Sequence, residues 1–150
     1  MKVSDILRVK GNTLYTLGPE HTLWAAVQLM ADRDIGSVVV MEQGRLAGIL
    51  TFREIISTLH KNGGQIGGGT IQSVMDRNPQ TVTPATDVNE VRRLMLDSHV
   101  RYLPVLDGQT LAGVISFYDV AKAVLEEQGL ENQMLMAYIR DWPEQESVSG

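Results

Sequence analysis

The chain contains no cysteine, which excludes disulfide frameworks, thiolate zinc sites and cysteine nucleophiles. It has no apolar run near the roughly 20 residues that cross a bilayer. Basic residues are also outnumbered by acidic ones: the chain has 13 Lys and Arg and 18 Asp and Glu. Neutralising nucleic-acid phosphates needs a clustered excess of positive charge, so the sequence predicts no binding to nucleic acid and none to a membrane.

The N-terminus has no signal-peptide character, since Asp5 and Arg8 interrupt its apolar stretch. We therefore expect a cytoplasmic protein. With 43% hydrophobic and 21% charged residues, the composition is that of an ordinary globular protein. A length of 150 residues suits one compact domain or two small subdomains that share a core.

The sequence repeats itself. A shift of 65 residues aligns residues 16–59 with residues 81–124 without a gap, and ten aligned positions are identical. Slightly upstream, residues 3–7 correspond to residues 71–75, with three extra residues in the first copy. Most other aligned pairs exchange similar residues, such as Leu50 and Ile115. The pattern indicates a tandem duplication, which must be recognised before the fold is predicted.

Each copy predicts the same order of elements. A short strand ends in a proline turn and precedes a helix with apolar residues at helical spacing. Two strands follow, at residues 38–41 and 46–50 in the first copy and at 103–106 and 111–115 in the second. A second helix begins at Thr51 or Ser116. The predicted unit is β-α-β-β-α, and the fold class is α/β of the α+β kind.

Composition changes mark the predicted boundaries: repeat 1 at 1–62, a glycine-rich linker at 63–70, repeat 2 at 71–128, and a C-terminal helix and tail at 129–150. We expect Gly129 to separate this helix from repeat 2. The helix carries an apolar stripe of Leu130, Met134, Leu135, Tyr138 and Ile139. The stripe must be buried on its own chain or on a partner.

One short motif lies at the same place in both copies. Residues 48–54 and 113–119 both read Gly, two apolar residues, Ser or Thr, two further residues, then Asp or Glu. This spacing places a hydroxyl and a carboxylate at the start of a helix that follows a strand. Helix N-termini favour phosphate, and a carboxylate can accept hydrogen bonds from ribose hydroxyls. A helix cap has the same pattern and needs no ligand, so both interpretations stay open.

The duplicated unit, the paired motifs and the segment at 100–105 resemble a tandem pair of CBS domains, also called a Bateman module. The resemblance covers about residues 1–127 and is strongest to stand-alone bacterial CBS-pair proteins. It implies two repeats in a pseudo-two-fold arrangement, with a C-terminal helix. It also implies binding of AMP, ADP, ATP, S-adenosylmethionine or NAD in clefts between the repeats, with AMP or ATP foremost, and association into disc-like homodimers.

The resemblance also assigns ligand contacts. Asp119 would hold the ribose, with Ser116 as the hydroxyl beside it, and Ile35 and Gly36 from the other repeat would contact adenine. Thr51 and Glu54 would act in the second cleft, where Glu is longer than the usual Asp. In that cleft, Val100, Arg101 and Tyr102 of the other repeat would contact adenine. The remaining predicted contacts are Val114, Ile49 and His99, and both Arg101 and His99 are candidates for phosphate contact. Arg101 can equally be a surface charge, and His99 a solvated or capping residue.

No catalytic or metal site is predicted. His21, His60 and His99 lack metal-ligand spacing, and no nucleophile elbow or paired-carboxylate site is present. Together with the resemblance, this predicts a regulatory ligand sensor that is not an enzyme, has no covalent cofactor and acts on an unidentified partner protein. The alternative is a structural dimerisation or scaffold protein with empty clefts.

Overall fold

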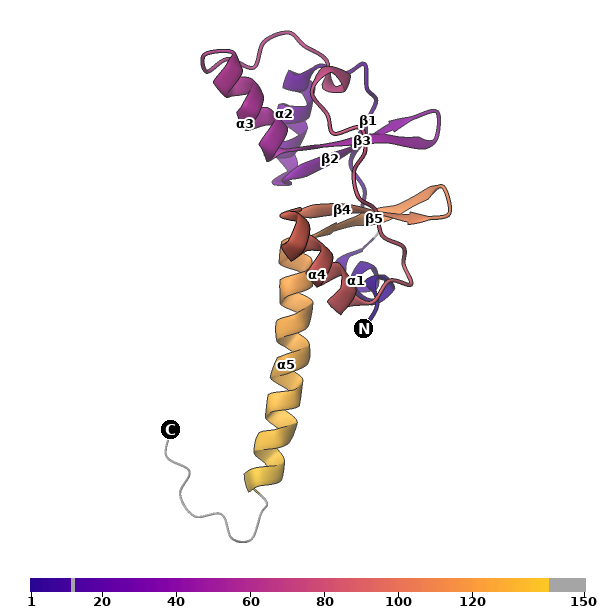
Figure 1. The fold of residues 1–150 in the computed structure, drawn as a ribbon, viewed down its shortest axis with the longest axis vertical. Helices are drawn as coiled ribbons and strands as arrows, with labels where there is room; N and C mark the ends of the chain where they lie inside the picture. Colours follow the sequence, from indigo (N-terminus) through magenta and orange to yellow (C-terminus); the bar gives the residue numbers. More distant parts are fainter. Residues whose placement is uncertain (12, 141–150) are drawn as a thin grey trace.

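The computed structural model describes residues 1–11 and 13–140, the side chains of residues 130 and 131 excepted (Figure 1). It confirms the predicted class, with two repeats of mixed helices and strands and a C-terminal helix. The first copy contains β1 (Thr16–Leu17), α2 (Leu23–Arg33), β2 (Ser37–Glu42), β3 (Arg45–Thr51) and α3 (Phe52–Lys61). The second contains α4 (Val88–Ser98), β4 (Tyr102–Asp107), β5 (Thr110–Ser116) and α5 (Phe117–Arg140).

One β-hairpin lies at the centre of each repeat. In the first, β2 pairs antiparallel with β3, and β1 adds parallel to β2. In the second, β4 pairs antiparallel with β5, and Val82 forms only a single parallel bridge to Val105. Both hairpins have a register shift at equivalent positions, after Val40 and after Val105. The apolar runs of β2 and β4 are buried, as expected for strands covered by helices.

Each repeat buries its own apolar core, but each core is completed by the segment that precedes the other copy. Val3 and Ile6 of helix α1 (Val3–Lys10) pack in the core of the second copy. Ile71 and Met75, around the 3-10 turn η1 (Ile71–Ser73), pack in the core of the first copy. Each folded core therefore combines one copy with the segment that precedes the other copy, so the cores do not coincide with the consecutive sequence repeats.

Backbone hydrogen bonds hold these exchanged segments at equivalent places. The amide of Val3 donates to the carbonyl of Thr86 at 2.9 Å, and the amide of Val88 donates to that of Met1 at 3.0 Å. In the other repeat, the amide of Ile71 donates to the carbonyl of His21 at 2.8 Å, and Leu23 donates to Gly69 at 2.9 Å. The symmetry of these bonds supports the duplication read from the sequence.

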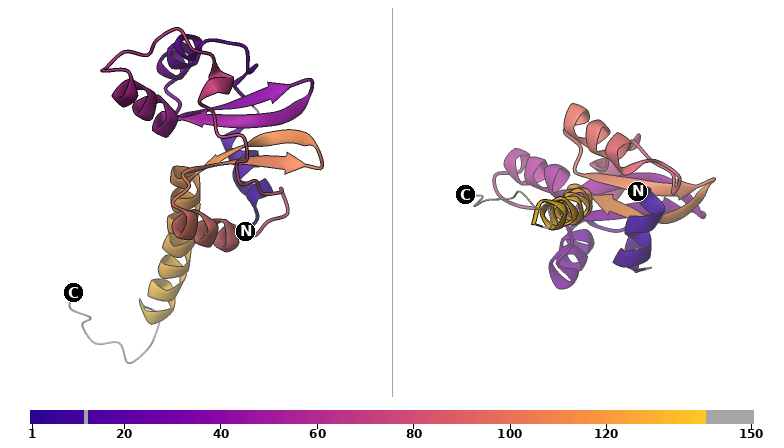
Figure 2. Two further views of the ribbon diagram at one scale, coloured as in Figure 1. Left: turned by 45° about the horizontal axis from the view of Figure 1, so that its top comes forward. Right: turned by 90° about the horizontal axis from the view of Figure 1, so that it is seen from below.

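The two sheets lie one above the other, with their hairpins pointing the same way and the helices on the outer sides (Figures 1 and 2). The start of α3 and the start of α5 therefore both face the region between the repeats. This arrangement brings the two sequence motifs, one per repeat, toward a common interface.

Helix α5 runs without interruption from Phe117 to Arg140, so the expected break at Gly129 is wrong. A single glycine costs a helix about 1 kcal/mol relative to alanine, which good helix-forming neighbours can offset. The first part of α5 is anchored in the second core by Val120 and Ala123. Its last turns extend away from both repeats (Figure 1). Among the described helices, none has the length and apolar character needed to cross a membrane.

Candidate functional site

Between the repeats, the described residues line two cavities. The first has a volume of about 1060 Å³ and is lined by the strand–helix junction of repeat 2, the loop after α2, and the end of α1 with the segment that follows it. The second, of about 450 Å³, is lined by the junction of repeat 1, the segment from Asp76 to Gln80, and the loop after α4. Each cavity therefore combines the motif of one repeat with a loop from the other.

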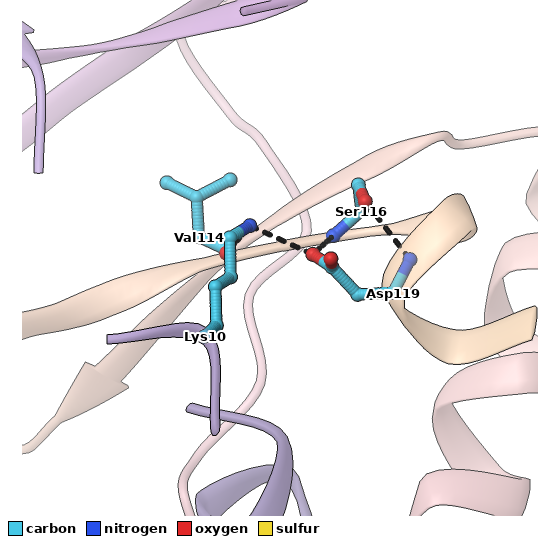
Figure 3. Close-up of polar contacts among 4 residues, drawn as sticks. All are labelled: Lys10, Val114, Ser116 and Asp119. Atoms are coloured by element: carbon cyan, nitrogen blue, oxygen red, sulfur yellow. Dashed lines mark hydrogen bonds and ion pairs between the residues drawn. The ribbon is translucent and has the colours of Figure 1, made fainter. Parts of the chain in front are cut away.

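In the first cleft, Ser116 and Asp119 form a reciprocal cap at the start of α5. The amide of Ser116 donates to Oδ2 of Asp119 at 2.9 Å, and the amide of Asp119 donates to Oγ of Ser116 at 3.1 Å (Figure 3). The helix-cap interpretation of the motif is therefore correct as local structure. It does not exclude a ligand, because capping leaves carboxylate lone pairs for further donors.

A lysine that the sequence analysis does not single out completes this cluster. Nζ of Lys10, at the end of α1, lies 2.7 Å from Oδ2 of Asp119 and donates to the carbonyl of Val114 at 2.8 Å (Figure 3). Lys10 lines the first cleft, whereas Asp119 is not among its lining residues. The Asp119 side chain is only 16% exposed. A ligand that uses Asp119 must therefore share it with Lys10 or displace Lys10.

In the second cleft, Thr51 and Glu54 form a capping box. Oε1 of Glu54 accepts hydrogen bonds from the Thr51 amide at 2.8 Å and from the Thr51 hydroxyl at 3.0 Å. Thr51 Oγ1 in turn accepts from the Arg53 amide at 3.2 Å. No cation contacts this carboxylate among the described residues. The two motif carboxylates thus share their capping role and differ in their charge partner.

The two clefts share one wall, formed by residues 99–102. Tyr102 packs its ring against Gly36 of the other repeat, where an added Cβ would collide with the phenol and lie 3.1 Å from Phe52. Gly36 therefore permits this close approach of the two repeats. His99 ends α4 in the left-handed conformation, with φ of 54°, and its amide donates to Met95, which supports its capping role.

Arg101 is the basic group at this shared wall. It is exposed, lines both clefts, and has no ion pair or side-chain hydrogen bond among the described residues. Arg53 lies across the second cleft, and its Nη2 donates to the carbonyl of His99 at 3.3 Å. An unpaired guanidinium in a cleft can bind an anionic oxygen of a ligand.

The structure brings all but one of the predicted residues into the lining of a cleft, although Val100, Arg101 and Tyr102, expected in the Glu54 cleft, line both clefts. Those that line the first cleft are Ile35, Gly36, His99, Val100, Arg101, Tyr102, Val114 and Ser116. Those that line the second are Ile49, Thr51, Glu54, His99, Val100, Arg101 and Tyr102. Asp119 is the exception, because its carboxylate lies against Lys10 instead of facing the cavity directly.

Sequence reasoning missed the segments that precede each first strand. Thr13, Leu14 and Tyr15 line the first cleft, and Asp76, Asn78, Pro79 and Gln80 line the second. These two segments correspond under the 65-residue shift, so extending the repeat alignment upstream could have indicated both. The motif glycines also have a packing reason. A Cβ on Gly48 would lie 3.0 Å from Met75 Sδ, and one on Gly113 would lie 2.7 Å from Leu7 Cδ2.

Comparison with known proteins gives one family. The CBS domain model matches residues 3–61 and 71–126. The chain is 31% identical over 147 residues to the mitochondrial CBS domain-containing protein CBSX3 of Arabidopsis thaliana, covering 92% of this chain and 71% of the relative. It also resembles the structure of a CBS-domain protein from Burkholderia ambifaria, with a TM-score of 0.78, 27% identity, and coverage of 99% and 100%.

Two structures at lower identity share the fold and contain ligands. CBSX2 in complex with AMP matches with a TM-score of 0.70 and 22% identity, covering 85% of this chain and 98% of that chain. The CBS domain pair of protein MJ0100, in complex with 5′-methylthioadenosine and S-adenosyl-L-methionine, matches with a TM-score of 0.75 and 22% identity, with coverage of 85% and 98%. At this identity the likeness concerns the fold.

Proposed function

Because this chain belongs to the CBS-domain family and carries two such domains in tandem, we propose that it is a regulatory module that senses adenosine nucleotides. The observation that carries the proposal is the composition of the first cleft. Ser116, the hydroxyl at one helix start, lines this cleft together with apolar and backbone groups of the other repeat, including Ile35 and Gly36. The carboxylate of Asp119 caps the same helix start and accepts a hydrogen bond from the Ser116 amide. Such a cleft offers acceptors to a ribose and an apolar surface to a base.

The position of the clefts supplies a mechanism of regulation. A ligand in the first cleft touches both repeats, so its affinity depends on how the repeats are arranged. It can shift that arrangement only by the difference in its affinity for the two states. A partner protein that recognises one arrangement would then respond to nucleotide concentration without any chemical step. AMP and ATP are the foremost candidates, and ADP, S-adenosylmethionine and NAD also contain the adenosine group.

The ligand complexes support adenosine as the common group. CBSX2 holds AMP, and the MJ0100 pair holds two adenosine-containing compounds in the same fold. The competing hypothesis is a scaffold with empty clefts, and the capping hydrogen bonds of Thr51 and Ser116 are compatible with it. The two hypotheses differ in whether an adenosine compound stabilises the folded chain.

A thermal-shift panel should therefore separate them. At 100 times its dissociation constant, a ligand specific for the folded state adds about 2.7 kcal/mol of stability. For a chain of this size that corresponds to a rise of roughly 5–10 °C in Tm. The matched controls are GMP and inorganic phosphate at equal ionic strength. A panel in which no adenosine compound shifts Tm would favour the scaffold, and an equal shift with GMP would contradict selectivity for adenosine.

The second cleft should be the weaker or differently selective one. The Glu54 side chain has one more methylene than Asp119, folds back on Thr51 and loses more rotamer freedom when it is ordered. Glu54→Asp should therefore strengthen binding in this cleft about threefold or more, as measured by two-site calorimetry. Asp119→Glu is the reverse substitution and should weaken the first cleft. Two equal, independent sites in the unmodified protein would contradict this prediction.

The proposed assembly is a homodimer that uses the end of α5. Met134, Leu135 and Met136 are 66%, 56% and 58% exposed, although each is a large apolar side chain. The last turns of α5 extend away from the repeats, which disfavours packing of the stripe on its own subunit (Figure 2). A second copy is the simplest cover for such a surface. The cytoplasmic location and the unidentified regulated protein stay predictions.

A further inference from the structure

Lys10 is the cation that distinguishes the first cleft. Its ammonium bridges the carbonyl of Val114 and the carboxylate of Asp119, at 2.8 Å and 2.7 Å, and its side chain is still 39% exposed. Because Lys10 is among the residues that line the cavity, a ligand in the cleft would lie beside its side chain. Lys10 therefore both neutralises Asp119 and presents positive charge to the site.

In the part of the chain that the structure describes, no lysine lines the second cleft and no cation pairs with Glu54. Leu7 and Met75 are equivalent positions: Leu7 lies beside the motif glycine Gly113 of repeat 2, and Met75 lies beside Gly48 of repeat 1. In the second cleft, the residue after Met75 is Asp76, and its backbone amide donates a hydrogen bond to the carbonyl of Ile49 at 2.9 Å. The equivalent carbonyl, that of Val114, accepts from the Lys10 ammonium instead. Lys10 lies between Leu7 and Thr16, where the first copy has its three extra residues.

The ammonium of Lys10 has unused capacity for an anion. It carries three N–H donors, and the described residues use two of them. The third is available to a phosphate oxygen, and charged donors form the stronger hydrogen bonds to such groups. Arg101 lines the same cleft and can add to this charge, while Asp34 opposes it. Since Lys10 pairs with Asp119, a phosphate entering the cleft does not face an uncompensated carboxylate.

We propose that Lys10 is the residue that makes the first cleft prefer adenosine ligands that carry a phosphate over those that carry none. The proposal rests on the proposed nucleotide-binding function and adds a phosphate contact beside the motif carboxylate of the first cleft, where Glu54 of the second cleft has no cation partner among the described residues. The proposal is tested by the ratio of the affinity for AMP to the affinity for adenosine. Loss of the ammonium should lower the affinity for AMP and leave the affinity for adenosine nearly unchanged, because adenosine has no phosphate for Lys10 to contact.

Calorimetry with AMP and adenosine tests this on the full chain. Lys10→Met should lower AMP affinity about 5- to 30-fold and change adenosine affinity less than twofold. The matched control is Lys61→Met, which removes the same charge from the exposed end of α3, outside both cavities. Lys10→Gln, which keeps a donor without the charge, should reproduce the loss, while Lys10→Arg should retain most of the preference. Melting curves without ligand would show whether each variant folds.

The remaining outcomes contradict the proposal in distinguishable ways. Equal losses for AMP and adenosine would mean that Lys10 acts only by positioning Asp119. Tighter binding of both would mean that Lys10 competes with the ribose for Asp119, and unchanged AMP binding would mean that it does not contact the phosphate. If neither compound binds the unmodified protein, the proposed function fails as well. Binding of both with an unchanged ratio in Lys10→Met overturns only this inference.

Discussion

Replacing Asp119 with alanine should weaken adenosine-nucleotide binding to the first cleft about 10- to 100-fold. Hydrogen bonds to a charged group contribute about 1.5–3 kcal/mol each, and every 1.4 kcal/mol is a tenfold change in affinity. In the folded protein, Asp119 accepts from the Ser116 amide and from Lys10, so its carboxylate is already held in one orientation. A positioned carboxylate can bind a ribose without a further ordering cost.

The substitution also removes a helix cap and an ion pair, so stability must be measured beside affinity. Asp119→Asn keeps an oxygen for the Ser116 amide while removing the charge, which separates capping from ligand binding. Asp97→Ala is the matched control, because Asp97 is an exposed carboxylate on α4 that lines neither cleft. Unchanged nucleotide affinity in a folded Asp119→Ala protein would show that Asp119 is only a cap.

Deleting residues 129–150 should convert a dimer into a monomer at micromolar concentration while the repeats stay folded. The deletion removes Met134, Leu135 and Met136, all more than half exposed on the single chain. Burying a side chain of this kind stabilises an interface by about 1.5–3 kcal/mol, so loss of the set should raise the dimer dissociation constant at least 100-fold. Val120 and Ala123, which anchor α5 in the second core, are retained.

Light scattering measures the outcome, and the far-ultraviolet spectrum and melting curve check the fold. In the full chain, Leu135→Glu should also weaken the dimer, because it places a charge in the apolar stripe. Gln133→Glu, an exposed polar position on the same helix, is the control for added charge. A monomeric unmodified protein would contradict the dimer itself. A dimer that survives the deletion would place its interface elsewhere, away from the end of α5.

Local features of the fold followed from the sequence because they depend on neighbouring residues. Short continuous apolar runs predicted the strands at residues 38–41 and 103–106, and the structure confirms them as parts of β2 and β4. The Ser or Thr with an acidic residue three positions later correctly predicted where α3 and α5 begin. The helix break predicted at Gly129 was wrong, because one glycine weakens a helix without ending it.

The sequence by itself determined the duplication, the order of the helices and hairpin strands in each copy, and the place of a hydroxyl and a carboxylate at two helix starts, since these depend on residues close together in the chain. The first strand expected in the second copy is reduced to a single bridge at Val82. Only the tertiary structure decided which repeat each preceding segment completes. An apolar pattern such as Val3 and Ile6 specifies burial and not the partner surface, and here α1 packs in the second copy. That exchange brings Lys10 to Asp119, 109 residues away, and thereby makes the two clefts differ in charge.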